Sequence, residues 1–136
     1  MPLLRPLLVL VLVLGLALVA TPAFAAVIRG TNGPDRLEGT PGSDRLYGRG
    51  GNDLLIGNRG PDRLYGGSGN DTLLGGQGGD HIFGGKGRDL ILAGAGNDRV
   101  SVRGGGWDRV ICGPGRDTVY ADPNDSVAGD CETVYR

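Results

Sequence analysis

Ten aspartates recur at a nearly constant spacing and determine which chemistry this sequence can support. Eight of them follow at nine-residue intervals and two more come after one ten-residue step: Asp35, Asp44, Asp53, Asp62, Asp71, Asp80, Asp89, Asp98, Asp108 and Asp117. A glycine stands two residues before each of the first eight, and a branched aliphatic residue stands two residues after it. Three positions that keep different chemistries in phase indicate a structural repeat.

A column of carboxylates at this spacing repels itself unless a cation lies between its members. Neighbouring strands lie about 4.8 Å apart, where two unit charges repel by about 1 kcal/mol in water and roughly 3–4 kcal/mol at an effective dielectric constant of 20. Carboxylates and the carbonyls of glycine-rich turns are hard oxygen donors, and a pliable cage of such donors suits Ca²⁺ better than Mg²⁺. We therefore expect Ca²⁺ as the ligand. The alternative is an empty coil in which aspartate serves only as a turn residue.

The elements that position these aspartates are short strands joined by glycine-rich turns. Each nine-residue unit divides into a glycine-rich half and a half that carries β-forming residues, which predicts one turn and one strand of about three residues. The eighth residue of the unit is always Leu, Ile or Val, so we expect it to face inward, while the mostly polar seventh residue faces outward by strand alternation. Such units stack into a solenoid.

The units GGSGNDTLL, GGQGGDHIF and GGKGRDLIL resemble the GGxGxDxUx nonapeptide of hemolysin-type (RTX) calcium-binding proteins. The resemblance extends over about residues 30–120. It implies an all-β fold, a parallel β-roll (right-handed β-solenoid) with two repeats per coil of 18 residues. Ca²⁺ would lie between stacked turns, held by the sixth-position aspartates and turn carbonyls. The implied pairs are Asp35/Asp53, Asp53/Asp71 and Asp71/Asp89 on one edge, and Asp44/Asp62, Asp62/Asp80 and Asp80/Asp98 on the other.

The chain departs from this pattern toward both ends. The second position of the first four units, where the family prefers glycine, holds Thr31, Thr40, Arg49 and Asn58. Ala93 replaces a first-position glycine. We expect the tightest sites between residues 66 and 98 and weaker sites before them.

Residues 1–25 have the features of a secretory signal peptide. Arg5 precedes an apolar run at residues 7–20, and Ala23-Phe24-Ala25 forms a small-x-small site, so we expect cleavage after Ala25. The alternative is a membrane anchor, but a span needs about 20 apolar residues. We therefore expect a secreted, extracellular protein without a membrane span, with repeats at 26–120 and a C-terminal cap at 121–136.

The remainder of the chain predicts one small domain, which we expect to be monomeric. With 14 basic and 15 acidic residues, the formal net charge of −1 gives no reason to expect nucleic acid as a partner. Cys112 and Cys131 are the only cysteines, and their separation of 19 residues exceeds one coil by one. If the coil continues, they lie in neighbouring rungs and form a disulfide.

The period breaks once, at residues 103–107. We expect the extra residue there to bulge a turn, and we expect Trp107 to pack over the adjacent coil rather than to anchor a ligand. The last unit of a solenoid must cover an open core, and Val127, Val134 and Tyr135 are the residues available for that cover.

No catalytic constellation is present, so we do not expect an enzyme. His81 is the only histidine and occupies an outward position, and no serine lies in a nucleophile motif. The favoured hypothesis is a secreted calcium-binding protein that folds around the ion after export. The alternative is a calcium-dependent adhesion or cell-envelope module that binds a surface polysaccharide through its outer face, where Arg36, Arg45, Arg63, Arg99 and Arg109 lie. An ice-binding coil would need a regular threonine array along one face.

Overall fold

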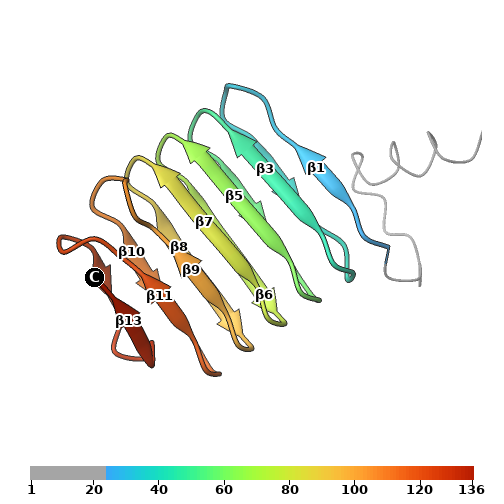
Figure 1. The fold of residues 1–136 in the computed structure, drawn as a ribbon. Coiled ribbons are helices and arrows are strands. Elements are labelled where there is room, and N and C mark those ends of the chain that lie inside the picture. Colours follow the sequence, from blue (N-terminus) through green and yellow to red (C-terminus); the bar gives the residue numbers. More distant parts are fainter. Residues whose placement is uncertain (1–23) are drawn as a thin grey trace, which may run out of the picture.

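A computed structural model describes residues 24–136 as a β-solenoid of about six turns (Figure 1). Most of the predicted signal peptide, residues 1–23, lies outside the described part of the chain. Residues 24–136 form parallel strands and no helix; accordingly, this part contains no helix with the length and hydrophobicity to cross a membrane. The predicted all-β parallel roll is confirmed.

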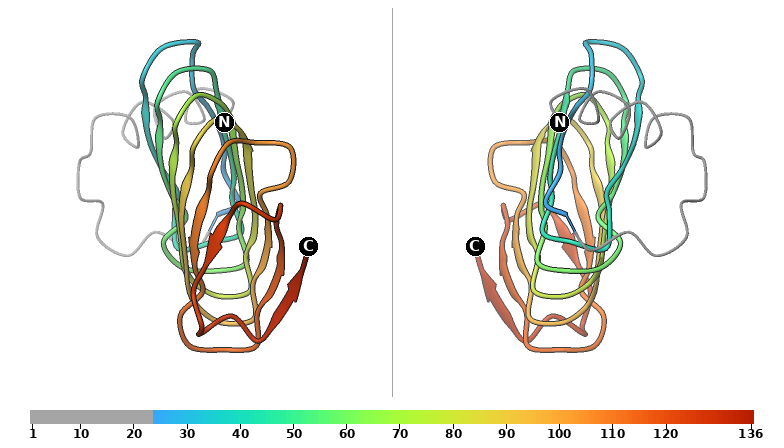
Figure 2. Two further views of the ribbon diagram at one scale, coloured as in Figure 1. Left: turned by 90° about the vertical axis from the view of Figure 1, so that its left-hand side faces the viewer. Right: turned by 90° about the vertical axis from the view of Figure 1, so that its right-hand side faces the viewer.

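The strands alternate between two sheets that form the long sides of each flattened coil (Figure 2). The seven-stranded sheet contains β1 (Val27–Arg29), β3 (Arg45–Arg49), β5 (Arg63–Ser68), β7 (His81–Lys86), β9 (Arg99–Ser101), β11 (Thr118–Tyr120) and β13 (Thr133–Tyr135). The six-stranded sheet contains β2 (Arg36–Glu38), β4 (Leu54–Ile56), β6 (Thr72–Gln77), β8 (Leu90–Ala95), β10 (Arg109–Ile111) and β12 (Ser126–Val127).

The register of both sheets follows the repeat. Leu46 pairs with Leu64 in one sheet and Leu55 pairs with Leu73 in the other, so equivalent residues of alternate units are neighbours. Two units therefore make one coil, as the resemblance implied. The extra residue before β10 is absorbed in the connection after β9, and the ladder resumes with Val110 beside Ile91.

The core is a stack of the eighth-position residues, which are all buried: Leu37, Leu46, Leu55, Leu64, Leu73, Ile82, Ile91, Val100, Val110 and Val119. This confirms the predicted inward position. The first position of the unit also faces inward, which the sequence analysis missed. From the eighth unit onward that position widens the core with apolar side chains: Ala93, Val102, Cys112 and Ala121.

The central strands are longer than the three residues predicted, because the glycine-rich half of the unit also pairs. Gly67 pairs with Gly85, and Gly76 pairs with Gly94, which extends β5 to β8 to six residues each. The backbone at Gly67 has a φ of 99°. Glycine adopts this left-handed region without steric cost, so the chain can turn directly after the paired segment.

The C-terminal coil continues the stack and is tied down by a disulfide. Cys112 and Cys131 are bonded, with a Cα–Cα distance of 5.3 Å, which confirms the predicted pair. Val127 packs partly buried against the core. Val134 pairs with the buried Val119 at the inward position of the last coil and is 38% exposed. Tyr135 stacks on Tyr120 and is 51% exposed, so it does not cover the core. They follow the last coil as β13, whose outer side faces solvent.

Trp107 does not pack over the neighbouring coil as we predicted, since it is 66% exposed. The next residue, Asp108, takes the inward position, and alternation then places Trp107 outward. The equivalent residues Asn70 and Arg88 are exposed for the same reason. Trp107 lines a shallow surface hollow together with Leu90.

Candidate metal centre

The aspartates form two hydrogen-bonded ladders inside the roll. In each ladder, one carboxylate oxygen accepts a hydrogen bond from the backbone N–H of the aspartate one coil earlier. Asp44 donates to Oδ1 of Asp62 at 2.7 Å, and Asp62 donates to Oδ1 of Asp80 at 2.8 Å. The same bond joins Asp89 to Asp108 across the bulge. Each aspartate thus fixes the distance between two coils.

The second carboxylate oxygen is the unusual feature of this site. In eight aspartates, Oδ2 is buried and has no hydrogen-bond partner in the described part of the chain: Asp53, Asp62, Asp71, Asp80, Asp89, Asp98, Asp108 and Asp117. Buried polar oxygens are almost always paired, and an unpaired buried charge is far more costly than an unpaired neutral group. Eight such atoms in two regular columns indicate a missing positive partner.

In the middle coils, the open oxygen lies beside a first-position glycine, and for Asp53, Asp62, Asp71 and Asp80 it also lies near the carbonyl of the following coil. In the units of Asp98, Asp108 and Asp117, the first position holds Ala93, Val102 and Cys112 instead. A methyl carbon at Gly48 would lie 2.5 Å from Oδ2 of Asp53 and against the carbonyl oxygen of Gly66. At Gly66 it would lie 2.6 Å from Oδ2 of Asp71 and against the carbonyl oxygen of Gly84. Glycine in the first position thus leaves two oxygens converging on a space that a side chain would fill.

The buried carboxyl groups hold their protons unusually strongly in the absence of a cation. Burial raises the pKa to about 7 for Asp62, Asp89 and Asp98, and to about 6 for Asp71 and Asp80. The ladder bond from the preceding coil opposes this rise, because an N–H donor favours the ionised carboxylate. The pKa is raised by burial at three further members of the ladders: Asp53, Asp108 and Asp117.

Asp35 and Asp44 differ from the other predicted ligands because the Oδ2 atom of each already accepts hydrogen bonds. Oδ2 of Asp35 accepts the backbone N–H of Thr31 at 2.6 Å, and Oδ2 of Asp44 accepts that of Thr40 at 2.6 Å. The threonine hydroxyls lie 3.0 Å and 3.1 Å from the same two oxygens. The first coil therefore supplies its own hydrogen-bond donors to these two carboxylates.

Two side chains that the sequence analysis did not assign end the ladders at the C-terminus. Asp125 accepts the N–H of Asp108 at 3.0 Å, and Glu132 accepts the N–H of Asp117 at 2.7 Å. Asp125 also accepts the N–H of Asp122. Neither residue keeps the nine-residue period, so spacing alone gave no signal for them. Asp125 is also buried.

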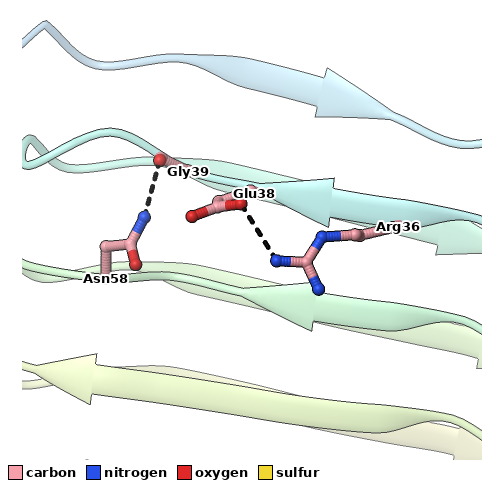
Figure 3. Close-up of polar contacts among 4 residues, drawn as sticks. All are labelled: Arg36, Glu38, Gly39 and Asn58. Carbon is pink, nitrogen blue, oxygen red and sulfur yellow. Dashed lines mark hydrogen bonds and ion pairs between the residues drawn. The ribbon is translucent and has the colours of Figure 1, made fainter. Parts of the chain in front are cut away.

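The N-terminal coils carry further polar contacts, shown in Figure 3. The side-chain amide of Asn58 donates to the carbonyl oxygen of Gly39 at 2.9 Å, one coil earlier. On the outer face of β2, Arg36 and Glu38 form an ion pair at 3.2 Å. Both side chains of this ion pair are more than half exposed, so it contributes little to stability.

The comparison with known proteins assigns the family. Residues 29–64, 47–82 and 65–100 each match the RTX calcium-binding nonapeptide repeat (4 copies). These segments together cover more than half of the chain, which therefore belongs to this family of calcium-binding repeat proteins. No curated protein and no solved structure matches the chain.

The residues present fit the ion that the family binds. The open atoms are carboxylate oxygens, those of Asp53, Asp62, Asp71 and Asp80 lie near backbone carbonyl oxygens, and Ca²⁺ is bound by such hard donors. The sites would use Asp53 to Asp117, and a bound cation would supply the positive charge that the buried carboxylates lack.

Proposed function

We propose that this chain is a secreted calcium-binding protein whose roll is stable only with Ca²⁺ bound between its turns. Calcium would be held by the ladder aspartates from Asp53 to Asp117 and by carbonyls of the first-position glycines. The observation that carries the proposal is the set of eight buried carboxylate oxygens without a partner in residues 24–136. In this proposal residues 1–25 are the signal peptide, residues 26–120 the roll and residues 121–136 the cap of a monomer.

The proposed dependence on calcium follows from the charge inside the roll. At neutral pH, ionised aspartates stacked in columns repel one another and lack water, so the metal-free roll opens. Extracellular calcium sites typically have dissociation constants on the order of 10⁻⁴–10⁻³ M. The chain would therefore stay loose at low cytoplasmic calcium and fold after export. We propose a binding role rather than a catalytic one, in keeping with a family of repeat proteins.

A calcium titration tests this proposal directly. We expect circular dichroism of the protein to change from a disordered to a β-rich spectrum as Ca²⁺ rises from chelated to millimolar concentration. Calorimetry should give a stoichiometry of several ions per chain, and Mg²⁺ at the same concentration should not produce the fold. A spectrum that stays unchanged over the whole titration would refute the ion-dependent fold.

The outer face of the seven-stranded sheet favours adhesion to an anionic polysaccharide as a second candidate function. Arg45, Arg63 and Arg99 are exposed in one column with the half-buried His81, and neighbouring members pair in register. The one ion pair within residues 24–136 is elsewhere, at β2. Arg45 and Arg63, on adjacent strands about 4.8 Å apart, repel each other, and a column of arginines is complementary to a linear polyanion.

An aromatic column runs beside these cations. Tyr47 and Tyr65 stack with ring centroids 4.8 Å apart, and Tyr65 and Phe83 stack at 4.9 Å, with nearly parallel planes. Each inner ring face is covered by its neighbour, so the column stiffens the sheet and presents ring edges rather than faces. The charged column is therefore the binding element of this second candidate.

Binding to polygalacturonate in the presence of calcium tests the adhesion candidate. We expect the double variant Arg63→Gln/Arg99→Gln to weaken binding at least tenfold, and Arg109→Gln, on the six-stranded sheet, to leave it unchanged. A neutral dextran should not bind. Equal affinity of both variants for the polyanion would exclude this face as the binding surface.

A further inference from the structure

The turns of this roll are of two kinds, which differ in what pairs with the aspartate. In the first two turns, Thr31 and Thr40 each direct a backbone N–H and a hydroxyl at Oδ2 of the aspartate four residues later. The eight later turns end at the ladder aspartates from Asp53 to Asp117. In each of them, Oδ2 of the aspartate is buried without a hydrogen-bond partner in the described chain. The difference therefore lies in the second residue of the unit.

The backbone explains why the two kinds of turn differ. In the third to seventh units the second residue has a positive φ: Arg49 at 78°, Asn58 at 79°, Gly67 at 99°, Gly76 at 101° and Gly85 at 97°. Neither Thr31 nor Thr40 has a positive φ, which agrees with the strong steric preference of β-branched residues against that region. The threonine turns thus keep the N–H directed at the carboxylate.

The hydroxyl of each threonine is oriented by a second hydrogen bond. The backbone N–H of Gly33 donates to Oγ1 of Thr31 at 3.1 Å, and that of Gly42 donates to Oγ1 of Thr40 at 3.0 Å. Because the threonine hydroxyl oxygen accepts this hydrogen bond, its own proton is free to be donated to the aspartate. The Thr40 hydroxyl also lies 2.7 Å from the carbonyl oxygen of Phe24, which competes for that proton, so the N–H of Thr40 is the constant partner of Asp44.

We infer that Thr31 and Thr40 take the place of the cation in the first two turns, so that calcium binding begins at Asp53 and the first coil is a metal-independent end of the roll. This inference rests on the proposed calcium-binding function and specifies which of its aspartates serve it. The backbone N–H of each threonine, joined at Asp35 by the hydroxyl of Thr31, occupies lone pairs of Oδ2 that a cation would use. Of the six pairs implied by the resemblance, Asp35/Asp53 and Asp44/Asp62 would each lack a free oxygen on one side.

The position of these threonines in the fold supports the assignment. The terminal coil of a solenoid has a neighbour on one side only and needs a different chemistry to end the stack. The amide of Asn58, which pairs with the carbonyl of Gly39, supplies a side-chain donor to a backbone oxygen at the same end (Figure 3). Side-chain donors thus pair both a carboxylate and a carbonyl oxygen there.

Matched substitutions in the full chain test the inference by counting ions in calorimetry. Asp35→Asn and Asp44→Asn should leave the number of bound Ca²⁺ ions at the wild-type value, whereas Asp53→Asn and Asp62→Asn should each lower it by at least one. Asparagine keeps an oxygen for the ladder bond at Asp44, Asp53 and Asp62, whereas the carboxylate of Asp35 accepts hydrogen bonds only from Thr31. An equal loss of ions on substitution at Asp35 and Asp53 would overturn the inference while leaving the proposed function intact.

A second measurement does not depend on the folding of any variant. In the wild-type protein saturated with metal and folded, the amide resonances of Thr31 and Thr40 should move little when Ca²⁺ is exchanged for Cd²⁺, whereas those of Arg49 and Gly67 should shift. Large shifts at the two threonines on this exchange would contradict the assignment. A wild-type chain that binds no calcium at all would instead refute the proposed function, and the inference with it.

Discussion

The backbone N–H of Asp44 donates to Oδ1 of Asp62 at 2.7 Å, while Oδ2 of Asp62 is buried with no hydrogen-bond partner in the described chain. One carboxylate therefore joins two coils through one oxygen and faces the proposed cation space with the other. Any change in the charge of Asp62 must also act on the spacing of the coils. This coupling is the basis of the predictions that follow.

Removing a single ladder charge should weaken calcium-dependent folding. We expect Asp80→Asn to raise the calcium concentration at the folding midpoint about tenfold or more, because one oxygen ligand and its charge are lost while the ladder bond can persist; a tenfold change corresponds to about 1.4 kcal/mol. Circular dichroism across a calcium titration measures the midpoint. Glu38→Gln on the exposed face of β2 is the control, and an equal midpoint for the two variants would count against the prediction.

The first-position glycines beside the open oxygens of Asp53, Asp62 and Asp71 should not tolerate a methyl group. We expect Gly66→Ala to lower the free energy of unfolding by about 1–3 kcal/mol, the usual cost of overpacking, since its Cβ would lie 2.6 Å from Oδ2 of Asp71. Thermal unfolding in saturating calcium measures this. Gly129→Ala, whose Cβ would meet nothing within 4 Å, should have the wild-type stability. Similar stabilities of the two variants would show that the space is not constrained.

Acid should have opposite effects on the metal-free and the calcium-bound protein. The pKa of Asp62, Asp89 and Asp98 is raised from 3.8 to about 7 in the metal-free fold. The folded chain then binds protons more tightly than the unfolded chain, and this stabilisation is lost as the pH rises from about 4 to about 7. Calcium requires the ionised carboxylates, so its affinity should fall as the pH drops below about 7.

Dichroism at about pH 5 and about pH 8 tests this pH dependence. With chelator, we expect more β-structure at the lower pH. With limiting calcium, we expect a higher midpoint concentration at the lower pH. A chelated protein with the same spectrum at both values would show that burial of these carboxyl groups does not control the metal-free fold.

The disulfide should stabilise the last coil without contributing to calcium binding. Its loop has a sequence separation of 19 residues, for which chain entropy gives about 3 kcal/mol. We expect Cys112→Ser/Cys131→Ser to lose about this free energy of unfolding and to bind the wild-type number of ions. Hydrogen exchange should increase first in β11 and β13. Uniformly faster exchange across all strands would indicate that the disulfide supports the entire roll.

The fold could be predicted from the sequence because each phase of the repeat has one structural role. Leu64 and Leu73 take the inward position, as every eighth residue of the unit does, and together with the two-repeat coil that the resemblance implies, this spacing predicts the register. The disulfide followed from the same spacing. The sequence did not predict the burial of the aspartates or the hydrogen bond that one carboxylate oxygen accepts from the preceding coil, because spacing does not tell which way a turn side chain points.

Several features that the sequence did not predict lie where the period breaks or ends. Asp125 and Glu132 continue the two ladders from loops of irregular length. Trp107 follows the alternation of its buried neighbour rather than its own hydrophobicity. Thr31 and Thr40 were noted as departures that would weaken nearby sites, but only their hydrogen bonds to the carboxylates show how. The prediction that the tightest sites lie between residues 66 and 98 is still to be tested.

The aspartate ladders also determine how the molecule would respond to mechanical force. Each ladder bond joins residues about one coil apart, such as Asp44 with Asp62 and Asp62 with Asp80. A chain pulled from its N-terminus would therefore lengthen in equal steps, one coil per step, instead of rupturing at once. The crosslink between Cys112 and Cys131 would leave a short loop that cannot be extended. Under force, the coils would thus open one after another, while the crosslinked C-terminal loop would stay closed.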